Sequence, residues 1–390
     1  MELKRYKLGE ILELQRGYDL PSSQQKAGNV LVAGSNGIIG YHNEIRGNHP
    51  CITVGRSGSV GKVHYYEQPT WAHNTALFVK DFKGNNPQYL YYFLKNLHLD
   101  EMFVKGSSVV PSLDRKVVHS LVVPFHKEVV CQKLIALVLS NIDRKIELNR
   151  AINQNLEAMA KQLYDYWFVQ FDFPNEEGKP YKSSGGEMLW NDKLKRNIPV
   201  GWHCGNLFEI AVFTNGLACQ KFRPKDDEVP LPVIKIREMH DGISVDTEEV
   251  TSNIPESVKV YNGDVLFSWS ASLEVMLWAY GLGGLNQHIF KVTSANDFPK
   301  SFYYFQLLDY VDVFKKMAEA RKTTMGHITQ DHLQQSTIAI PDNKDIADKF
   351  EELISPIFKQ IVKLQEEISN LIKQRDELLP LLMNGQITIE

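Results

Sequence analysis

The feature that most constrains this chain is a pair of long apolar stripes that have the same spacing. The later stripe lies within residues 350–382, where apolar residues recur at alternating steps of four and three. That spacing lines one face of a helix, and a helix with such a face buries it against a partner helix. The stripe consists of Phe350, Ile354, Ile357, Ile361, Leu364, Ile368, Leu371, Leu378 and Leu382, and only Arg375 interrupts it.

The partner helix is predicted in the same chain. Counting back 215 positions from Phe350 gives Ile135, and the whole stripe repeats in the same phase from there. Its members are Ile135, Leu139, Ile142, Ile146, Asn149, Asn153, Leu156, Ala160, Leu163 and Trp167. The two Asn residues interrupt the apolar seam, and polar residues at such positions commonly fix the register of a helix pair. The chain is therefore predicted to be an internal duplication held together by an intramolecular coiled coil.

The segments that precede the two helices are predicted to mix strands and helices. Short apolar runs such as Val30–Ala33 and Cys51–Val54 alternate with Gly-rich turns, whereas residues 88–101 have helical spacing. The predicted fold class is α+β, with two mixed α/β domains in tandem, each followed by a long helix. The predicted boundaries are 1–127 for the first domain, 128–171 for the first helical region, 172–201 for a linker, 202–341 for the second domain and 342–390 for the second helical region.

The linker indicates the direction of the two helices. A parallel pair would require the linker to travel back about 50 Å, whereas an antiparallel pair only requires it to turn around. We therefore expect an antiparallel coiled coil with pseudo-two-fold symmetry, a symmetry that suits duplex DNA, and a parallel pair is the alternative. Residues 172–201 are polar and rich in Pro and Gly, so they are expected to lie along a surface rather than to pack.

Composition excludes several classes of protein. A chain of 390 residues with 43% hydrophobic content can bury a core in each of two or three domains. No apolar run approaches the ~20 residues of a membrane span, and residues 1–10 lack the apolar core of a signal peptide, which predicts a cytoplasmic location. The histidines are scattered and the cysteines have no paired spacing, so neither a metal site nor a disulfide framework is expected. The cysteines are Cys51, Cys131, Cys204 and Cys219.

The distribution of charge differs between the two domains. Residues 1–127 hold 15 Lys and Arg against 10 Asp and Glu, whereas residues 200–341 hold 12 against 17. If both domains contact DNA, the positive net charge of the first domain favours binding to the phosphates. The second domain, whose net charge is negative, must then have its basic residues on one face.

The second domain repeats the scaffold of the first but not its loops. Gly205-Asn206-Leu207 echoes Gly9-Glu10-Ile11, Asn286–Phe290 echoes Asn74–Phe78, and Phe302–Phe305 echoes Leu90–Phe93. The Gly-rich loop at residues 55–62 has only Ser268–Ser272 opposite it. Shared scaffolds with divergent loops are expected of two domains that read different sequences, and drift after duplication is the alternative.

The loops hold the candidate DNA contacts, because amide, hydroxyl and cationic side chains there can reach phosphates and base edges. In the first domain the candidates are Ser35, Asn36, Arg56, Ser57, Ser59, Lys62 and Asn74. In the second domain they are Ser268, Trp269, Ser270, Asn286 and Gln287. Two equivalent loops that precede the closing strands add Lys105, Ser107 and Ser108, and Arg321, Lys322, Thr323 and Thr324. Ordinary turns and surface loops are the alternative interpretation of all these segments.

No catalytic site can be assembled from the sequence. The loop at residues 55–63 is not a phosphate-binding loop, because five residues separate Gly55 from Gly61 and Val63 stands where a hydroxyl should bind magnesium. No Asp/Asn-Pro-Pro-aromatic run is present for amino-group methylation. The nuclease-like run Pro341-Asp342-Asn343-Lys344 is interpreted as the start of a helix, because the equivalent Pro124–Lys127 lacks the acid.

These features resemble the specificity subunit of type I restriction–modification systems over nearly the full chain. Each domain closes on a strand that ends in Pro124 or Pro341 and continues into a long helix, and the first has the motifs Gly34-Ser35-Asn36-Gly37 and Gly55-Arg56-Ser57-Gly58-Ser59. The central run Leu163–Pro174 and the tail Leu378–Ile387 are similar to the family's conserved regions. The second domain departs from the family in lacking the Gly-rich loop and a counterpart of Gln132.

The resemblance implies a non-catalytic subunit that reads a bipartite site in double-stranded DNA, with one half-site for each target-recognition domain. Two methyltransferase subunits would dock on the helices, and translocase and nuclease subunits would join them. Methyl donor and ATP would belong to those partners, so no cofactor is expected in this chain. Apolar residues on the outer faces of the helices fit such docking: Leu148, Ile152, Met159, Ile372 and Leu379. The alternative is a coiled-coil scaffold that assembles partner enzymes without reading DNA.

Overall fold

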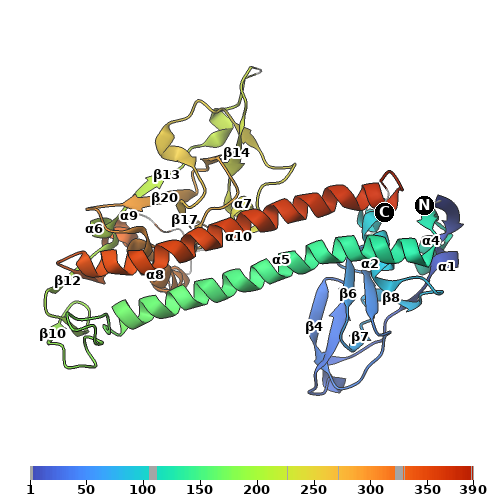
Figure 1. Cartoon of the computed structure of the whole chain (residues 1–390), viewed down its shortest axis with the longest axis horizontal. Coiled ribbons are helices and arrows are strands. Elements are labelled where there is room, and N and C mark those ends of the chain that lie inside the picture. The colour runs from blue at the N-terminus through green and yellow to red at the C-terminus, as the bar shows by residue number, and fades with distance from the viewer. Residues whose placement is uncertain are drawn as a thin grey trace. The chain divides into compact units, whose positions relative to one another are not determined.

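A computed structural model describes residues 3–104, 112–225, 227–270, 272–320, 328, 330–387 and 389 (Figure 1). The chain divides into two compact units. The first unit comprises Met1–Ile146 and Leu371–Glu390, and the second comprises Glu147–Asn370. Each unit therefore holds one domain together with one end of each of two long helices, α5 (Val129–Tyr164) and α10 (Asp345–Met383). Among the helices of the described residues, none is both long and apolar enough to cross a membrane.

The first unit contains two small sheets and a separate strand pair. One sheet has the order β2-β8-β5-β6, and the other has the order β4-β3-β7, with β3 and β7 parallel. The strand pair joins the start of the domain to its end, since β1 (Leu3–Lys7) pairs antiparallel with β9 (Val122–His126). The sheet strands are β2 (Glu13–Arg16), β3 (Val30–Gly34), β4 (Gly37–His42), β5 (Cys51–Gly55), β6 (Val63–Tyr66), β7 (Thr70–Ala72) and β8 (Ala76–Asp81). The short helices are α1 (Leu8–Ile11), α2 (Pro87–Asn96), α3 (Leu99–Val104) and α4 (Arg115–Ser120).

The second unit repeats this topology with one additional strand, β16. Its sheets have the orders β13-β20-β17-β18 and β15-β14-β19-β16, with β14 and β19 parallel. Its closing pair is β12 (Trp202–Gly205) with β21 (Ile338–Pro341). The sheet strands are β13 (Ala211–Asn215), β14 (Leu231–Ile234), β15 (Glu249–Val250), β16 (Lys259–Val260), β17 (Val265–Ser268), β18 (Glu274–Leu277), β19 (Gly283–Leu285) and β20 (Ile289–Ser294). The helices are α6 (Leu207–Ile210), α7 (Ile236–Asp241), α8 (Lys300–Ala320) and α9 (Gln330–Gln334). The predicted duplication of mixed α/β domains, each followed by a long helix, is confirmed.

The two long helices run antiparallel in the first unit. Asp143 on α5 lies 2.8 Å from the Nη1 atom of Arg375 on α10. His126, just before α5, places its Nε2 3.2 Å from the carbonyl oxygen of Leu382 near the end of α10. As the residue number increases from His126 to Asp143, the number of the contacting residue on α10 decreases from Leu382 to Arg375.

The same direction holds in the second unit. Asn149 donates from Nδ2 to Glu367 at 3.0 Å, and Asn153 donates from Nδ2 to the Ile361 carbonyl at 3.3 Å. Antiparallel pairing is thus observed independently in each unit, and the parallel alternative is wrong. The two seam asparagines bond across the helix pair, as polar residues that fix register do.

The predicted seam residues are all removed from solvent, wholly or in part. The buried members are Ile135, Leu139, Ile146, Ile354, Ile361, Leu364, Ile368 and Leu382. The half-buried members are Ile142, Leu156, Leu163, Ile357, Leu371 and Leu378. One prediction for the outer face is wrong, because Leu379 is buried in the core of the first unit beside Leu382 and Met383. Of the other outer-face residues, Leu148, Ile152 and Met159 are exposed and Ile372 is half-buried.

The interruption of the stripe at Arg375 has a specific partner. The Arg375 guanidinium pairs with Asp143, and the hydroxyl of Tyr92 on α2 donates to the same carboxylate at 2.6 Å. All three side chains are largely removed from solvent. A charge in such a place destabilises the fold unless it is paired and hydrogen-bonded, and both conditions are met here.

The predicted linker is folded rather than laid along a surface. Residues 172–201 contain an antiparallel hairpin of β10 (Met188–Asn191) and β11 (Arg196–Pro199). Phe173 is buried and stacks on Trp202, with ring centroids 5.7 Å apart. Asp172 accepts hydrogen bonds from the backbone and hydroxyl of Ser183. The expectation of an unpacked linker is therefore wrong, because its few aromatic residues join the core of the second unit.

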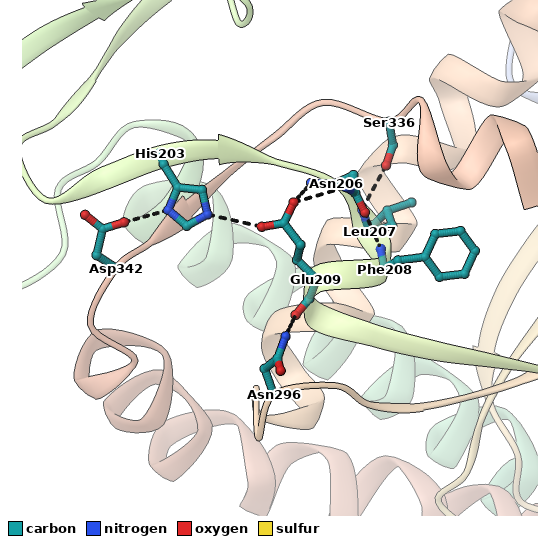
Figure 2. A network of polar contacts seen from close by, with 8 residues as sticks. All are labelled: His203, Asn206, Leu207, Phe208, Glu209, Asn296, Ser336 and Asp342. Atoms are coloured by element: carbon teal, nitrogen blue, oxygen red, sulfur yellow. Dashed lines mark hydrogen bonds and ion pairs between the residues drawn. The ribbon is translucent and has the colours of Figure 1, made fainter.

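A polar network joins the start of the second domain to the start of α10 (Figure 2). His203 on β12 lies between two carboxylates, with Nδ1 2.6 Å from Asp342 and Nε2 3.3 Å from Glu209. Glu209 also accepts from the backbone N–H of Asn206 at 2.9 Å, which caps α6. Asn343 accepts from the backbone N–H of Asp345, the first residue of α10, so the nuclease-like run is the start of a helix, as predicted.

The capping of α6 shows that the predicted correspondence of Gly205–Leu207 with Gly9–Ile11 is out of register. In the first unit, Glu10 accepts from the backbone N–H of Lys7, the equivalent of the bond between Glu209 and Asn206. The structure therefore pairs Leu8–Ile11 with Leu207–Ile210, and Gly205 is not the counterpart of Gly9.

Candidate nucleic-acid interface

Three loops of the first domain converge at one end of its sheets. They are the β3–β4 turn, the β5–β6 loop and the β7–β8 loop. The backbone N–H groups of Arg56 and Ser57 donate to the Thr75 carbonyl at 2.9 and 3.1 Å, which ties the second loop to the third. Lys62 donates to the side-chain oxygen of Asn36 at 2.9 Å, which ties the second loop to the first. The sequence-predicted residues of the first domain that the structure describes therefore lie on loops joined to one another.

Gly55 is required for this arrangement. A Cβ atom on Gly55 would lie 1.8 Å from the Ser59 carbonyl oxygen and 3.0 Å from that of Ser35. Only a residue without a side chain lets the β5–β6 loop fold back so closely. The loop is then closed by its own backbone, since Gly55 donates to the Lys62 carbonyl and Gly61 donates to the Gly55 carbonyl. The side chains of this loop are therefore presented from a closed backbone frame.

Asn36 could either present its side chain to DNA or only supply the left-handed backbone conformation of the turn. The backbone angles favour the first of these interpretations. Gly37 has a φ of 110°, whereas Asn36 is not among the residues with positive φ. Gly37 thus supplies the unusual conformation, and the Asn36 amide is left to bind Lys62 at the surface.

Cations dominate the converged loops. Lys62 is exposed, and Arg56 is half-buried with Nη1 3.5 Å from the Asn74 carbonyl oxygen. Asn74 donates to Asp19, which also pairs with Arg16 at 3.0 Å. Arg16 lies on β2, far from the loops in sequence, and no loop motif marks it, so the sequence reasoning missed it. The loops and the neighbouring end of β2 thus hold Arg16, Arg56 and Lys62, of which only Arg16 is paired with Asp19, and this excess of positive charge favours an anionic ligand.

The serines of the first domain differ in their positions. Ser57 forms an isolated antiparallel bridge with Ser112, and Leu113 donates to the Arg56 carbonyl at 2.9 Å. Ser35 and Ser59 are half-buried, and their carbonyl groups pack around Gly55. The backbone of all three serines builds the loops.

The second domain has the same loop junction with different side chains. Trp269 donates from its backbone to the His288 carbonyl at 3.3 Å, as Arg56 does to Thr75. Asn286 donates to the Ile234 carbonyl, as His73 does to Ala33. The structural counterpart of Asn286 is therefore His73, so the predicted echo of residues 286–290 with residues 74–78 is wrong by one position. Trp269 stands in the place of Arg56, Gln287 in that of Asn74 and His288 in that of Thr75.

Three predicted contacts in the second domain have little exposed surface. Ser268, Ser270 and Asn286 are all buried. The Ser268 hydroxyl accepts from the Glu274 backbone at 3.1 Å and donates to the Ser272 carbonyl, so it closes its own short hairpin. The Asn286 side chain accepts from the His288 backbone at 3.3 Å. Ser268 and Asn286 thus shape the loops, and the burial of all three side chains leaves little surface for a direct DNA contact.

Trp269 and Gln287 remain as candidates, both half-buried. The Trp269 indole donates to Asn215 at 3.3 Å and packs against the His288 ring, with centroids 5.6 Å apart. The amide of Gln287 lies 3.3 Å from Nε2 of His288. At this junction an indole therefore replaces the Arg56 guanidinium, an imidazole replaces the Thr75 hydroxyl, and an amide is kept.

Helix α7 adds a basic residue, Arg237, that the sequence reasoning missed. Ile234 is the counterpart of Ala33, so α7 begins where the first domain has its Ser35-Asn36 turn. Arg237 on α7 is exposed on one side and pairs with the buried Glu238 at 2.7 Å. No repeat of the turn motif could indicate this site, because a helix replaces the turn.

Seven predicted contacts lie outside the described residues. They are Lys105, Ser107, Ser108, Arg321, Lys322, Thr323 and Thr324.

The described residues offer no sign of metal or thiol chemistry. Among them, no group of three or more His, Cys, Asp or Glu side chains is arranged to hold a metal ion. The four cysteines are free thiols, and burial raises the pKa of Cys51 to about 12. A thiol of that pKa is not a nucleophile at neutral pH.

Comparison with known proteins identifies the family. The family model described as the type I restriction modification DNA specificity domain matches residues 2–158 and 199–374. The chain belongs to this family. It is a type I specificity subunit with two DNA-recognition domains in tandem.

Individual relatives of this family match over most of their length. The MjaIX specificity subunit of Methanocaldococcus jannaschii is 26% identical over 314 residues, which cover 78% of this chain and 69% of the relative. The HindI specificity subunit of Haemophilus influenzae is 23% identical over 362 residues, which cover 77% of each. The crystal structure of a type I S subunit from M. genitalium has a TM-score of 0.64 at 14% identity, over 98% of this chain and 96% of that one, which supports the fold.

Proposed function

We propose that this specificity subunit reads a bipartite site in double-stranded DNA, one half-site for each recognition domain, and has no catalytic activity of its own. The observation that carries this proposal is the loop junction that occurs in both domains with different side chains. Arg56 and Asn74 in one domain are replaced by Trp269 and Gln287 in the other on equivalent backbone bonds. A conserved frame with exchanged side chains is how one fold presents two different base-reading surfaces.

The partners in this proposal are two methyltransferase subunits that dock on the long helices, joined by translocase and nuclease subunits. The two relatives are each named as the specificity subunit of a type I restriction enzyme, which supports a multi-subunit assembly. In the second unit, α5 exposes Leu148, Ile152 and Met159 on one face. Exposed apolar side chains at such spacing suit a protein partner. Methyl donor and ATP belong to those partners in this scheme.

The Arg56 side chain provides the direct test. In the complex with the methyltransferase partner, Arg56→Ala should weaken binding by about 5- to 100-fold, the range expected when one base or phosphate contact is lost. The loss should disappear on duplexes whose first half-site is scrambled and persist on duplexes whose second half-site is scrambled. Competition gel shifts with the intact duplex and the two scrambled duplexes measure both effects.

Lys80→Ala is the matched control, because Lys80 is an exposed cation near the end of β8 remote from the Thr75 junction. It should bind like the wild type. An equal loss for Arg56→Ala at both half-sites would contradict the assignment of one half-site to each domain. Binding that is independent of sequence and falls uniformly with salt would instead support the scaffold alternative.

A further inference from the structure

Strand β4 exposes large apolar side chains directly beside the cationic loops. Ile38, Ile39 and Tyr41 are each about half exposed. The strand lies at the edge of the sheet β4-β3-β7. Exposed edge strands normally carry charged residues or proline, which prevent aggregation. Clustered apolar side chains on such an edge therefore mark a surface that is covered when the protein works.

A β-bulge sets the position of Ile39 within this strand. Val32 pairs with Gly40 and Ala33 pairs with Ile38, so Ile39 is the extra residue that has no partner on β3. Bulges re-aim a side chain and occur often beside functional sites. Here the Ile39 Cγ2 atom lies 3.0 Å from the point that a Cβ on Gly34 would occupy, and the Thr75 hydroxyl oxygen lies 3.3 Å from the same point. The bulge thus places the Ile39 side chain, 55% exposed, next to Thr75.

Thr75 is the residue at which the loops meet, because its carbonyl accepts from the backbones of Arg56 and Ser57. An exposed aliphatic group therefore stands among the amides and cations of the candidate interface. A ligand that fits this surface must combine negative charge, hydrogen-bonding edges and an apolar group. The major groove of DNA offers all three, since phosphates and base edges flank the 5-methyl group of thymine.

We propose that Ile39 contacts the 5-methyl group of a thymine in the half-site of the first domain and thereby helps to specify that base. This inference rests on the proposed function. It assigns to the bulge in β4 the role of aiming one apolar side chain at the base edges, while Arg56 and Lys62 bind the surrounding phosphates or polar edges.

Uracil substitution tests the contact, because uracil differs from thymine only in lacking the methyl group. Each thymine of the first half-site is replaced in turn, and binding of the complex with its methyltransferase partner is measured by competition. One substitution should weaken binding of the wild type by about fourfold, the effect of removing one buried methyl group. Ile39→Ala should bind the thymine and uracil duplexes equally.

Ile45→Ala is the matched control, because Ile45 is 56% exposed but follows β4 at the end remote from the loops. It should retain the penalty for uracil. A penalty that persists in Ile39→Ala, no penalty at any position, or a first half-site without thymine in either strand would overturn the inference. Failure of the proposed function is a separate result, in which the wild type does not distinguish its motif from a scrambled duplex.

Discussion

At the scale of single residues, His203 makes the fold of the second unit sensitive to pH. Partial burial alone would lower its pKa, but the hydrogen bonds to Asp342 and Glu209 outweigh burial and raise the pKa above the ordinary value of 6.5. The folded state therefore binds the proton more tightly than the unfolded state. The stabilisation is fully present below the unfolded pKa and is lost as the pH rises through the folded pKa.

We predict that His203→Gln destabilises the chain at about pH 6 and has no effect at about pH 9. The side chain is 46% exposed, so solvent screening limits the difference to about 1 kcal/mol or less. Thermal unfolding at the two pH values measures it, and 1 M NaCl should shrink it. His98→Gln is the control, since that side chain is 65% exposed and its nearest carboxylate is 3.9 Å away. A larger effect at high pH than at low pH would contradict the assignment.

The sequence indicated which loops hold polar side chains, but not which of those side chains reach the surface. Asn36 and Lys62 were both selected from their own Gly-rich loops, and the structure joins them. The burial of Ser268 was not predictable, because a hydroxyl that closes a hairpin and one that faces solvent look the same in sequence. Whether Ser35, Arg56, Trp269 or Gln287 contacts DNA stays a prediction.

At the scale of elements, the seam between α5 and α10 stabilises the first unit. We predict that Leu139→Ala costs about 2–5 kcal/mol, because Leu139 is 0% exposed and its loss leaves a cavity. Leu137→Ala, two residues away and 54% exposed, should change stability by less than about 0.5 kcal/mol. Amide hydrogen exchange in residues 129–146 measures both, because a chain with two domains does not unfold in one step. Equal effects of the two variants would contradict the seam.

The long helices were predictable because a repeated stripe determines both the helix and its partner. Their direction followed from the length of the linker, although the linker itself was misjudged. Within the linker region Phe173 stacks on Trp202, and the two residues are widely separated in the sequence and have no periodicity that would reveal their contact. Helix α7 was not predicted from the internal repeat, because the first domain has a turn and not a helix at the equivalent position.

At the scale of the whole molecule, the duplication explains how one chain can read two sequences. Both domains keep the same order in the four-stranded sheet and the same closing strand pair, and the second domain adds β16 to its other sheet. The two domains differ in charge, with 15 basic against 10 acidic residues in residues 1–127 and 12 against 17 in residues 200–341. The first half-site should therefore contribute more of the salt dependence of binding, and the second should depend more on Trp269 and neighbouring polar groups.

The most direct test of the central claim is the methylation pattern of a host that expresses this subunit with its methyltransferase partner. We predict a split, asymmetric motif with two specific parts separated by a non-specific spacer. Exchanging residues 202–341 for the second domain of another specificity subunit should change only one part of that motif. A continuous palindromic motif, or a motif that persists when this chain is deleted, would contradict the account.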